Sequence, residues 1–382
     1  MAIISIGKID KKLIPMVVGC IFCFLNRLLN QYDGTLLFKN PIMTNISISS
    51  SKLFTIVPFL ISHKFYKNDV HAINKIKTLQ NKYTIEKEKV TKGKWPYLFF
   101  SAMVFFVNQF LYVITIKIKS NTSILNILIT SIFYYYIFKA KLFRHHYFSC
   151  VLIIITGLSI DLILENLQYD LSNNLPLFFV RILRELFYSL SSVIDKYIME
   201  RKFVSVYELL LSNGVIILII LIIFAVFDYN FFGIDNYSEY FSNFNFKELL
   251  VIFGVLITQF GLNLCILITN KNNSPCHIFI IFISGQLALY VDFSGISLIV
   301  LFFLIFILFL SLIFNEIIEI NFWGLSYNTK NNIIKRAIAE ENMIITRKDT
   351  NDNNTVDAGQ YEINMVSCHN EEDEEKVEQT NI

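Results

Sequence analysis

The sequence predicts an all-α polytopic membrane protein with ten transmembrane helices, arranged as two inverted repeats of five helices. Of the 382 residues, 54% are hydrophobic and only 17% are charged, whereas soluble domains carry about 25% charged residues. The mean hydropathy is +0.52. Apolar segments about as long as the ~20 residues of a membrane-spanning helix recur along the chain. Basic and acidic loops alternate between these segments, as expected of a polytopic protein.

Ten apolar segments follow one another before the C-terminal tail. Two of them are weaker than the rest. One contains Lys52 and Pro58, and the ninth meets the tenth across a minimal loop. The segments span residues 13–30, 47–66, 95–115, 121–139, 146–165, 176–198, 205–227, 247–269, 275–293 and 296–316.

The charge of the loops predicts how the chain is oriented. Residues 67–94 form a Lys-rich loop, and the loop around Lys141 is also basic, whereas the alternate loops are acidic. By the positive-inside rule the basic loops are cytosolic, and ten spans then put both termini in the cytosol. Lys117 and Lys119 disagree with this rule, because they fall on the other side.

These segments and loops define the expected organisation. It comprises a cytosolic N-terminus at 1–12, a first five-helix repeat at 13–165, a second at 176–316 and a cytosolic tail at 317–382. Capping residues within 328–341 predict a short helix at the start of the tail. The remainder of the tail is rich in Asn and Glu, so we expect it to be disordered.

A weak internal repeat relates the two halves. Gln109-Phe110 in the third segment and Gln259-Phe260 in the eighth lie 150 residues apart. Two halves of five helices each have opposite orientations in a membrane, because five is odd. This is the pattern of inverted-repeat transporters.

The sixth segment carries an unusual number of ionisable side chains. At ~100° per residue, five polar residues fall within about 40° of one line along the helix. Ionisable groups within a bilayer rarely face lipid. The segment therefore predicts either a structural polar seam between helices or a wall of a central cavity. The five residues are Arg181, Glu185, Tyr188, Ser192 and Asp195.

We expect the substrate site to gather around this helix. A guanidinium group suits phosphate or carboxylate because its donors form a planar fork. Asp195 and Lys196 lie near the cytosolic end of the helix, where gating is the expected role. The expected substrate-binding residues are Arg181, Arg184, Glu185, Tyr188, Asn108, Gln109, Gln259 and Asn263.

Motifs of enzyme chemistry are absent from the sequence. It contains no Walker loop, GxGxxG, GxSxG or HExxH, so we expect neither an enzyme nor a bound cofactor. The pair His145-His146 is interpreted as part of a solvated loop, with no metal site. The expected partners are a small anionic substrate, the lipid bilayer and, as an option, a second copy in a homodimer. No nucleic-acid partner is expected.

Three stretches carry a resemblance to a known family. They are Phe106–Tyr112, Ile127–Ile160 and Asp195–Glu200. Together they resemble the drug/metabolite transporter superfamily, in its EamA-like and nucleotide-sugar-transporter-like branch. The resemblance implies ten helices in two inverted five-helix repeats and a solute exchanger of the Golgi or endoplasmic reticulum. The chain departs from nucleotide-sugar transporters at 125–127, where Leu-Asn-Ile stands in place of their Gln-Leu-Lys.

These features together predict a secondary transporter that works by alternating access. Its expected substrate is a small anionic metabolite such as a nucleotide sugar. The alternative is a non-transporting membrane scaffold or receptor whose cytosolic tail binds partners. An ion channel is a weaker option, because no loop resembles a selectivity filter.

Overall fold

The computed structural model divides the chain into two compact units, Met1–Thr329 and Lys330–Ile382. In the second unit the described residues, 332–339, form a helix inside the stretch 328–341 where the sequence predicts one. Residues 340–382 of the tail and residues 67–92 of the Lys-rich loop lie outside the described residues. The structure describes residues 4–6, 11–32, 41–61, 93–115, 125–168, 171–232, 246–290, 295–320, 325, 327, 329 and 332–339.

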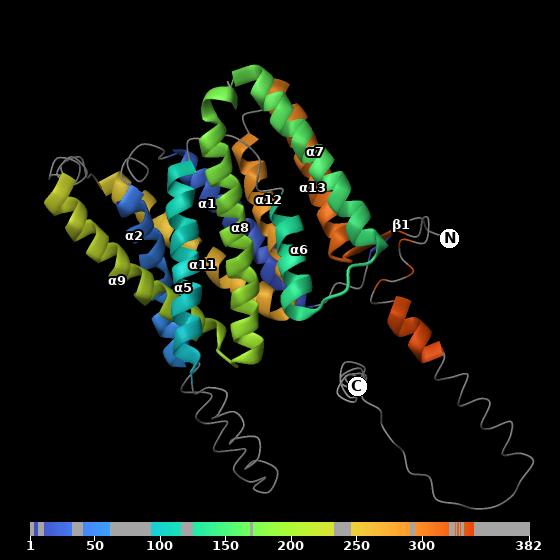
Figure 1. Cartoon of the computed structure of the whole chain (residues 1–382), viewed down its shortest axis with the longest axis horizontal. Coiled ribbons are helices and arrows are strands. Elements are labelled where there is room, and N and C mark those ends of the chain that lie inside the picture. The colour runs from blue at the N-terminus through green and yellow to red at the C-terminus, as the bar shows by residue number, and fades with distance from the viewer. Residues whose placement is uncertain are drawn as a thin grey trace, which may run out of the picture. The chain divides into compact units, whose positions relative to one another are not determined.

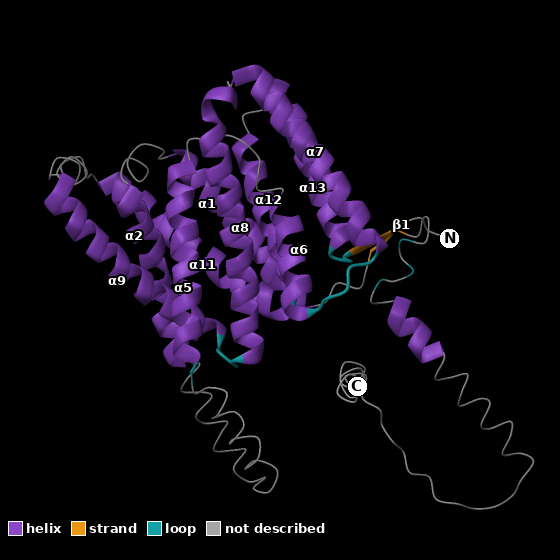
Figure 2. Ribbon diagram, in the orientation of Figure 1, coloured by secondary structure: helices purple, strands orange, loops and turns teal. Residues whose placement is uncertain are grey.

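The first unit is built almost entirely of helices (Figures 1 and 2). Short 3-10 turns, η1 (Lys11–Leu13), η2 (Lys52–Thr55), η4 (Pro275–His277) and η5 (Ala288–Tyr290), adjoin some of them. Its described α-helices are α1 (Ile14–Tyr32), α2 (Pro41–Ser51), α5 (Lys94–Thr115), α6 (Leu125–Phe138), α7 (Arg144–Gln168), α8 (Leu171–Arg201), α9 (Val206–Phe232), α11 (Phe246–Asn272), α12 (Ile278–Leu287) and α13 (Gly295–Phe314).

The helices confirm that the chain is an all-α membrane protein. Each of the ten predicted apolar segments overlaps one of these helices, the second only over its first five residues. Among the described residues, four stretches are both long and apolar enough to cross a bilayer: Lys11–Leu29, Val206–Phe224, Leu249–Asn272 and Ser297–Phe314. Three shorter apolar helical stretches accompany them, Asn45–Ile61, Leu125–Phe138 and Pro275–Tyr290.

The surface of the bundle is apolar and its interior holds many polar groups. Large hydrophobic side chains such as Ile21, Phe99, Leu158, Ile219 and Phe302 are exposed. A water-soluble protein rarely exposes so extensive an apolar surface. The arrangement suits a bundle whose outer face contacts acyl chains and whose polar groups face inward.

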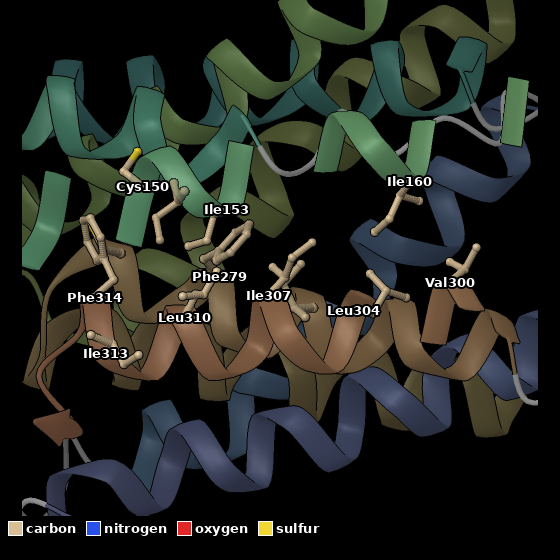
Figure 3. Packing of buried hydrophobic residues seen from close by; sticks show 13 residues of the cluster. Cys150, Ile153, Ile160, Phe279, Val300, Leu304, Ile307, Leu310, Ile313 and Phe314 are labelled. Atoms are coloured by element: carbon tan, nitrogen blue, oxygen red, sulfur yellow. The ribbon is translucent and has the colours of Figure 1, made fainter. Parts of the chain in front are cut away.

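Six pairings of helices organise the bundle. In the centre, α1 packs against α11 and α12, and α8 packs against α5 and α6 (Figure 1). The pairs α7–α13 and α2–α9 flank this centre. Figure 3 shows the α7–α13 contact, where Leu304 and Ile307 of α13 point toward Ile153 of α7 and Phe279 of α12. All four side chains are almost fully buried. Along α13 the buried residues Val300, Leu304, Ile307 and Leu310 recur every three or four positions, so they form one face of a helix that is apolar on all sides.

Two short strands bring the ends of the bundle sequence together. β1 (Ile4–Ile6) pairs antiparallel with β2 (Ile318–Ile320), with Ser5 opposite Glu319. The residues before the first helix and those after α13 therefore lie at the same end of the bundle. A chain that starts and finishes at one end passes through the bundle an even number of times.

The second apolar segment is not a regular helix. α2 ends at Ser51, the 3-10 turn η2 occupies Lys52–Thr55, and helical structure resumes at residues 56–61. A 3-10 stretch in the middle of a helix often marks a hinge or a site under local strain. Here the interruption coincides with Lys52, the charged residue that makes this segment weak in the sequence.

Glycines allow α1 to pack closely against its neighbours. A Cβ added at Gly261 of α11 would lie 2.7 Å from the ring of Phe22 in α1. A Cβ at Gly19 of α1 would lie 2.9 Å from Ile281 in α12. Small residues at such contacts are typical of helix packing in membranes, because van der Waals contact replaces the missing hydrophobic driving force.

We expect Gly261→Ala to destabilise the protein. The new methyl group would overpack the α1–α11 contact, which costs about 1–3 kcal/mol of the free energy of unfolding. Gly254→Ala, seven positions earlier on the same helix, is the control, because the nearest atom to its Cβ would be Leu29 Cδ1 at 3.5 Å. Thermal unfolding in detergent, followed by size-exclusion chromatography, measures both. Equal melting temperatures for the two variants would contradict this packing.

Candidate functional site

The polar face of α8 points into the bundle, as the sequence predicts. Arg181, Glu185 and Asp195 are 7%, 3% and 6% exposed, whereas Phe179 and Leu183 on the other side are 62% and 44% exposed. The charged groups of α8 are therefore shielded from lipid. The face divides into two parts with different surroundings.

The part of this face around Glu185 is a seam of paired groups. Arg184 forms an ion pair with Glu185. The amide of Asn126 in α6 donates to the other oxygen of Glu185 at 3.4 Å, and Ser189 Oγ donates to the Asn126 carbonyl at 3.3 Å. Buried Arg181 lies one turn away on the same helix. These groups tie α8 to α6.

The other part of the face lines a cavity of about 100 Å³. One water molecule occupies roughly 10–15 Å³ on this kind of measure, so the cavity can hold several waters or a small solute. Side chains from η2, α5, α8, α9, α11 and α12 form its wall. The polar residues of the lining are Lys52, Gln109, Tyr188, Ser191, Ser192, Asp195, Asn213, Gln259, Asn263 and Asn270.

Lys52 is the residue of this cavity that was least expected from the sequence. Its side chain is 1% exposed, and its ammonium lies 3.3 Å from the centre of the Phe105 ring. Among the described residues, no carboxylate lies within ion-pair distance of it. A Cβ at Gly214 of α9 would lie 2.7 Å from the Lys52 Cβ, so this glycine makes room for the lysine.

Asp195 is the carboxylate of the described cavity wall, and its neighbours hold it in place. Ser101 Oγ in α5 donates to Asp195 Oδ1 at 2.6 Å. Ser101 in turn accepts from the Asn213 amide of α9 at 3.2 Å. The chain Asn213–Ser101–Asp195 links three helices and fixes the position of the carboxylate.

Three asparagines of the cavity wall have a polar atom without a hydrogen-bond partner. They are Asn213 Oδ1, Asn263 Nδ2 and Asn270 Oδ1, all buried. Each residue uses its other amide atom, since Asn270 Nδ2 donates to the Ser192 carbonyl and Asn263 Oδ1 accepts from Gln259. Buried polar groups in native proteins nearly always have partners. These three atoms are themselves fully buried, so a solute in the cavity could reach them only after the wall moves.

Lys196 ties α8 to the end of α11 beside the cavity. Its ammonium donates to the carbonyls of Asn270 and Asn273 at 3.0 and 2.7 Å and pairs with Glu200 at 2.6 Å. The Asn273 amide donates to the Lys12 carbonyl at 3.1 Å, next to the start of α1. These bonds join three chain segments at the end of the bundle where β1 and β2 lie.

The structure brings together some of the residues expected at a substrate site. Tyr188, Gln109, Gln259 and Asn263 line the cavity, and so does Asp195, for which the sequence predicts gating. Arg181, Arg184, Glu185 and Asn108 are buried or half-buried but are not part of the lining. Lys52 joins the site instead, and its only signal in the sequence is a lysine within an apolar segment.

A second cluster of titratable residues lies away from the cavity. His145, His146 and Glu316 offer ligand atoms within 4.8 Å of one another. However, Nδ1 of His146 accepts the backbone N–H of Phe143 at 3.1 Å. A neutral imidazole whose Nδ1 accepts carries its proton on Nε2, so this ring has no second lone pair to offer a metal ion.

Comparisons with models of known protein families and with curated proteins found no match to this sequence.

Replacement of Ser101 tests the hydrogen-bond chain behind the cavity. We expect Ser101→Ala to lower the free energy of unfolding by about 1–3 kcal/mol, because Asp195 and Asn213 both lose a buried partner. Ser159→Ala is the matched control. Ser159 bonds only to the Ile155 carbonyl of its own helix. Chemical or thermal unfolding in detergent measures both variants, and an unchanged Ser101→Ala protein would refute the network.

Proposed function

We propose that this chain is a secondary carrier that works by alternating access, with ten transmembrane helices in two inverted repeats, as in the drug/metabolite transporter superfamily. The observation that carries the proposal is the polar cavity. Helices of both halves of the sequence contribute to its wall, yet it lies inside a bundle with an apolar outer surface. Carriers bind their substrates at such an interface between repeats.

The packing of the helices supports the inverted repeat. Exchanging the first five helices in order with the last five leaves the main pairings unchanged. The contacts of α1 with α11 and α12 become those of α8 with α5 and α6. The pairs α7–α13 and α2–α9 are each exchanged with themselves. A two-fold axis in the membrane plane would produce this equivalence.

The buried cation of the cavity supports a substrate with an anionic group. Lys52 has no ionic partner within contact among the described residues, and burying an unpaired ammonium is costly. A phosphate or carboxylate of a bound solute would offset this cost. We propose that the substrate is a small anionic metabolite, the class that includes nucleotide sugars, and that the carrier acts in the Golgi or endoplasmic reticulum with cytosolic termini.

The contacts of Lys196 support its proposed role as a gate. They hold the end of α8 against the end of α11, and the Asn273 amide continues the contact to the Lys12 carbonyl at the start of α1. Because α8 and α11 both lie in the second half, an opening between the two halves at this end would have to break the Asn273–Lys12 hydrogen bond. The 3-10 turns η2 and η4, next to the cavity, are candidates for the hinges of this motion.

A counterflow assay in proteoliposomes tests the carrier. The wild-type protein should accumulate at least one labelled solute from a set of nucleotide sugars, sugar phosphates, nucleotides, carboxylic acids and amino acids. Lys52→Met should reduce this uptake by at least about tenfold, the worth of a charged hydrogen bond. Lys271→Met, at an exposed lysine of α11, is the control and should leave uptake unchanged. No accumulation of any of these solutes would count against a carrier.

Deletion of residues 350–382 separates the carrier from the scaffold or receptor alternative. A carrier should keep its full uptake rate without this tail, because the tail lies outside the unit that contains the cavity. A scaffold would lose its function on the same deletion. Loss of uptake by a truncated protein that still inserts and elutes as a single peak would favour the alternative.

A further inference from the structure

Two opposite charges line the same cavity without touching each other. Lys52 comes from η2 in the first half of the chain, and Asp195 comes from α8 in the second half. They attract each other electrostatically, but they do not form an ion pair. The described wall of the cavity therefore contains a cationic group, the Lys52 ammonium, and an anionic group, the Asp195 carboxylate.

Each charge is fixed by its own neighbours. The Phe105 ring lies against the Lys52 ammonium, and Gly214 lets the lysine backbone approach α9. Ser101 holds Asp195 by a hydrogen bond of 2.6 Å. The two groups are thus positioned from different helices and remain separate in the absence of a solute.

The uncharged groups of the wall add hydrogen-bonding side chains beside the two charged residues. Gln109, Tyr188 and Gln259 line the cavity from three different helices. Their amide and hydroxyl groups can both donate and accept, as a ligand with an ammonium and a carboxylate requires.

The charge balance distinguishes between classes of substrate. The cavity has one positive and one negative group, so a solute with only negative charge would gain from Lys52 and be repelled by Asp195. A solute with two negative charges would meet this repulsion twice over. A solute with one anionic and one cationic group can pair with both residues at once.

We propose that the substrate is a small zwitterion of the amino-acid type, whose anionic group binds Lys52 and whose ammonium group binds Asp195. This inference rests on the carrier function proposed above and replaces the purely anionic substrate class with a zwitterion that retains an anionic group. The cavity volume of about 100 Å³ agrees with a small solute, since pockets for drug-sized ligands span roughly 300–1,000 Å³.

Matched sets of solutes test this assignment on the reconstituted full-length protein. The zwitterions are alanine and leucine, each compared with the acid that lacks the amino group and the amine that lacks the carboxyl group. Wild-type protein should take up each zwitterion at least about tenfold faster than the corresponding acid or the corresponding amine. Asp195→Asn, which retains the acceptor for Ser101, should lose this preference and gain uptake of the acids. Lys52→Met should lose it and gain uptake of the amines.

The double variant Lys52→Met/Asp195→Asn guards against loss of folding. It removes both charges together, so no charge is left uncompensated in the cavity. It should fold like the wild type and show no preference among the three charge types. The melting temperature of each single variant in detergent, compared with that of the double variant, identifies any single variant whose uptake is lost through unfolding.

The outcomes separate this inference from the carrier function. Uptake of nucleotide sugars or simple acids without uptake of alanine or leucine overturns the zwitterion assignment and leaves the carrier standing. An Asp195→Asn variant that folds and keeps the wild-type preference also overturns it. Absence of uptake for every solute, in this set and in the counterflow set, overturns the carrier itself.

Discussion

The burial of ionised side chains in an apolar bundle is the constraint on which this structure depends. A charge removed from water needs partners, and in a bilayer the lipid cannot supply them. On α8 the requirement is met in two ways. Arg184 and Glu185 pair within the seam, and Lys196 binds carbonyl oxygens at the end of α11. Lys52 alone faces an aromatic ring and a cavity, without a contact ion pair among the described residues. Among the described residues the fold thus gives partners to the charges of α8, whereas Lys52 has no contact ion pair.

The placement of Lys52 has consequences for the backbone around it. The chain leaves the α-helical geometry at η2, and α9 carries a glycine where the lysine approaches. Both features bring a long polar side chain into the interior of the bundle. The α7–α13 pair is packed differently, because its contact is mainly a row of apolar side chains (Figure 3). Polar atoms without partners are not confined to the cavity wall, since Ser149 Oγ of α7 also lacks one among the described residues.

The sequence predicts the helices well because their signal is local. Runs of about 20 apolar residues determine where each helix lies, and the rotation of ~100° per residue is sufficient to predict that Arg181, Glu185 and Asp195 turn inward together. The composition of the cavity is not local. Arg184 pairs with its neighbour Glu185 and does not line the cavity. Asn126 of α6, which is distant in the sequence, binds the same carboxylate. Lys52 marks its segment as a weak helix in the sequence, and only the packing of α2 and η2 against α9 and α11 reveals that it lines a cavity.

On energetic grounds the polar cavity favours the proposed carrier over a purely structural bundle. Burying an ammonium without an ionic partner is costly, and apolar replacement of buried charges is often neutral or stabilising. Lys52 is such an ammonium among the described residues, and it lines a cavity. The anionic group of a solute would offset this cost. Such a solute also has to enter and leave, so the contacts from Lys196 through Asn273 to Lys12 at one end of the wall have to open in the proposed carrier.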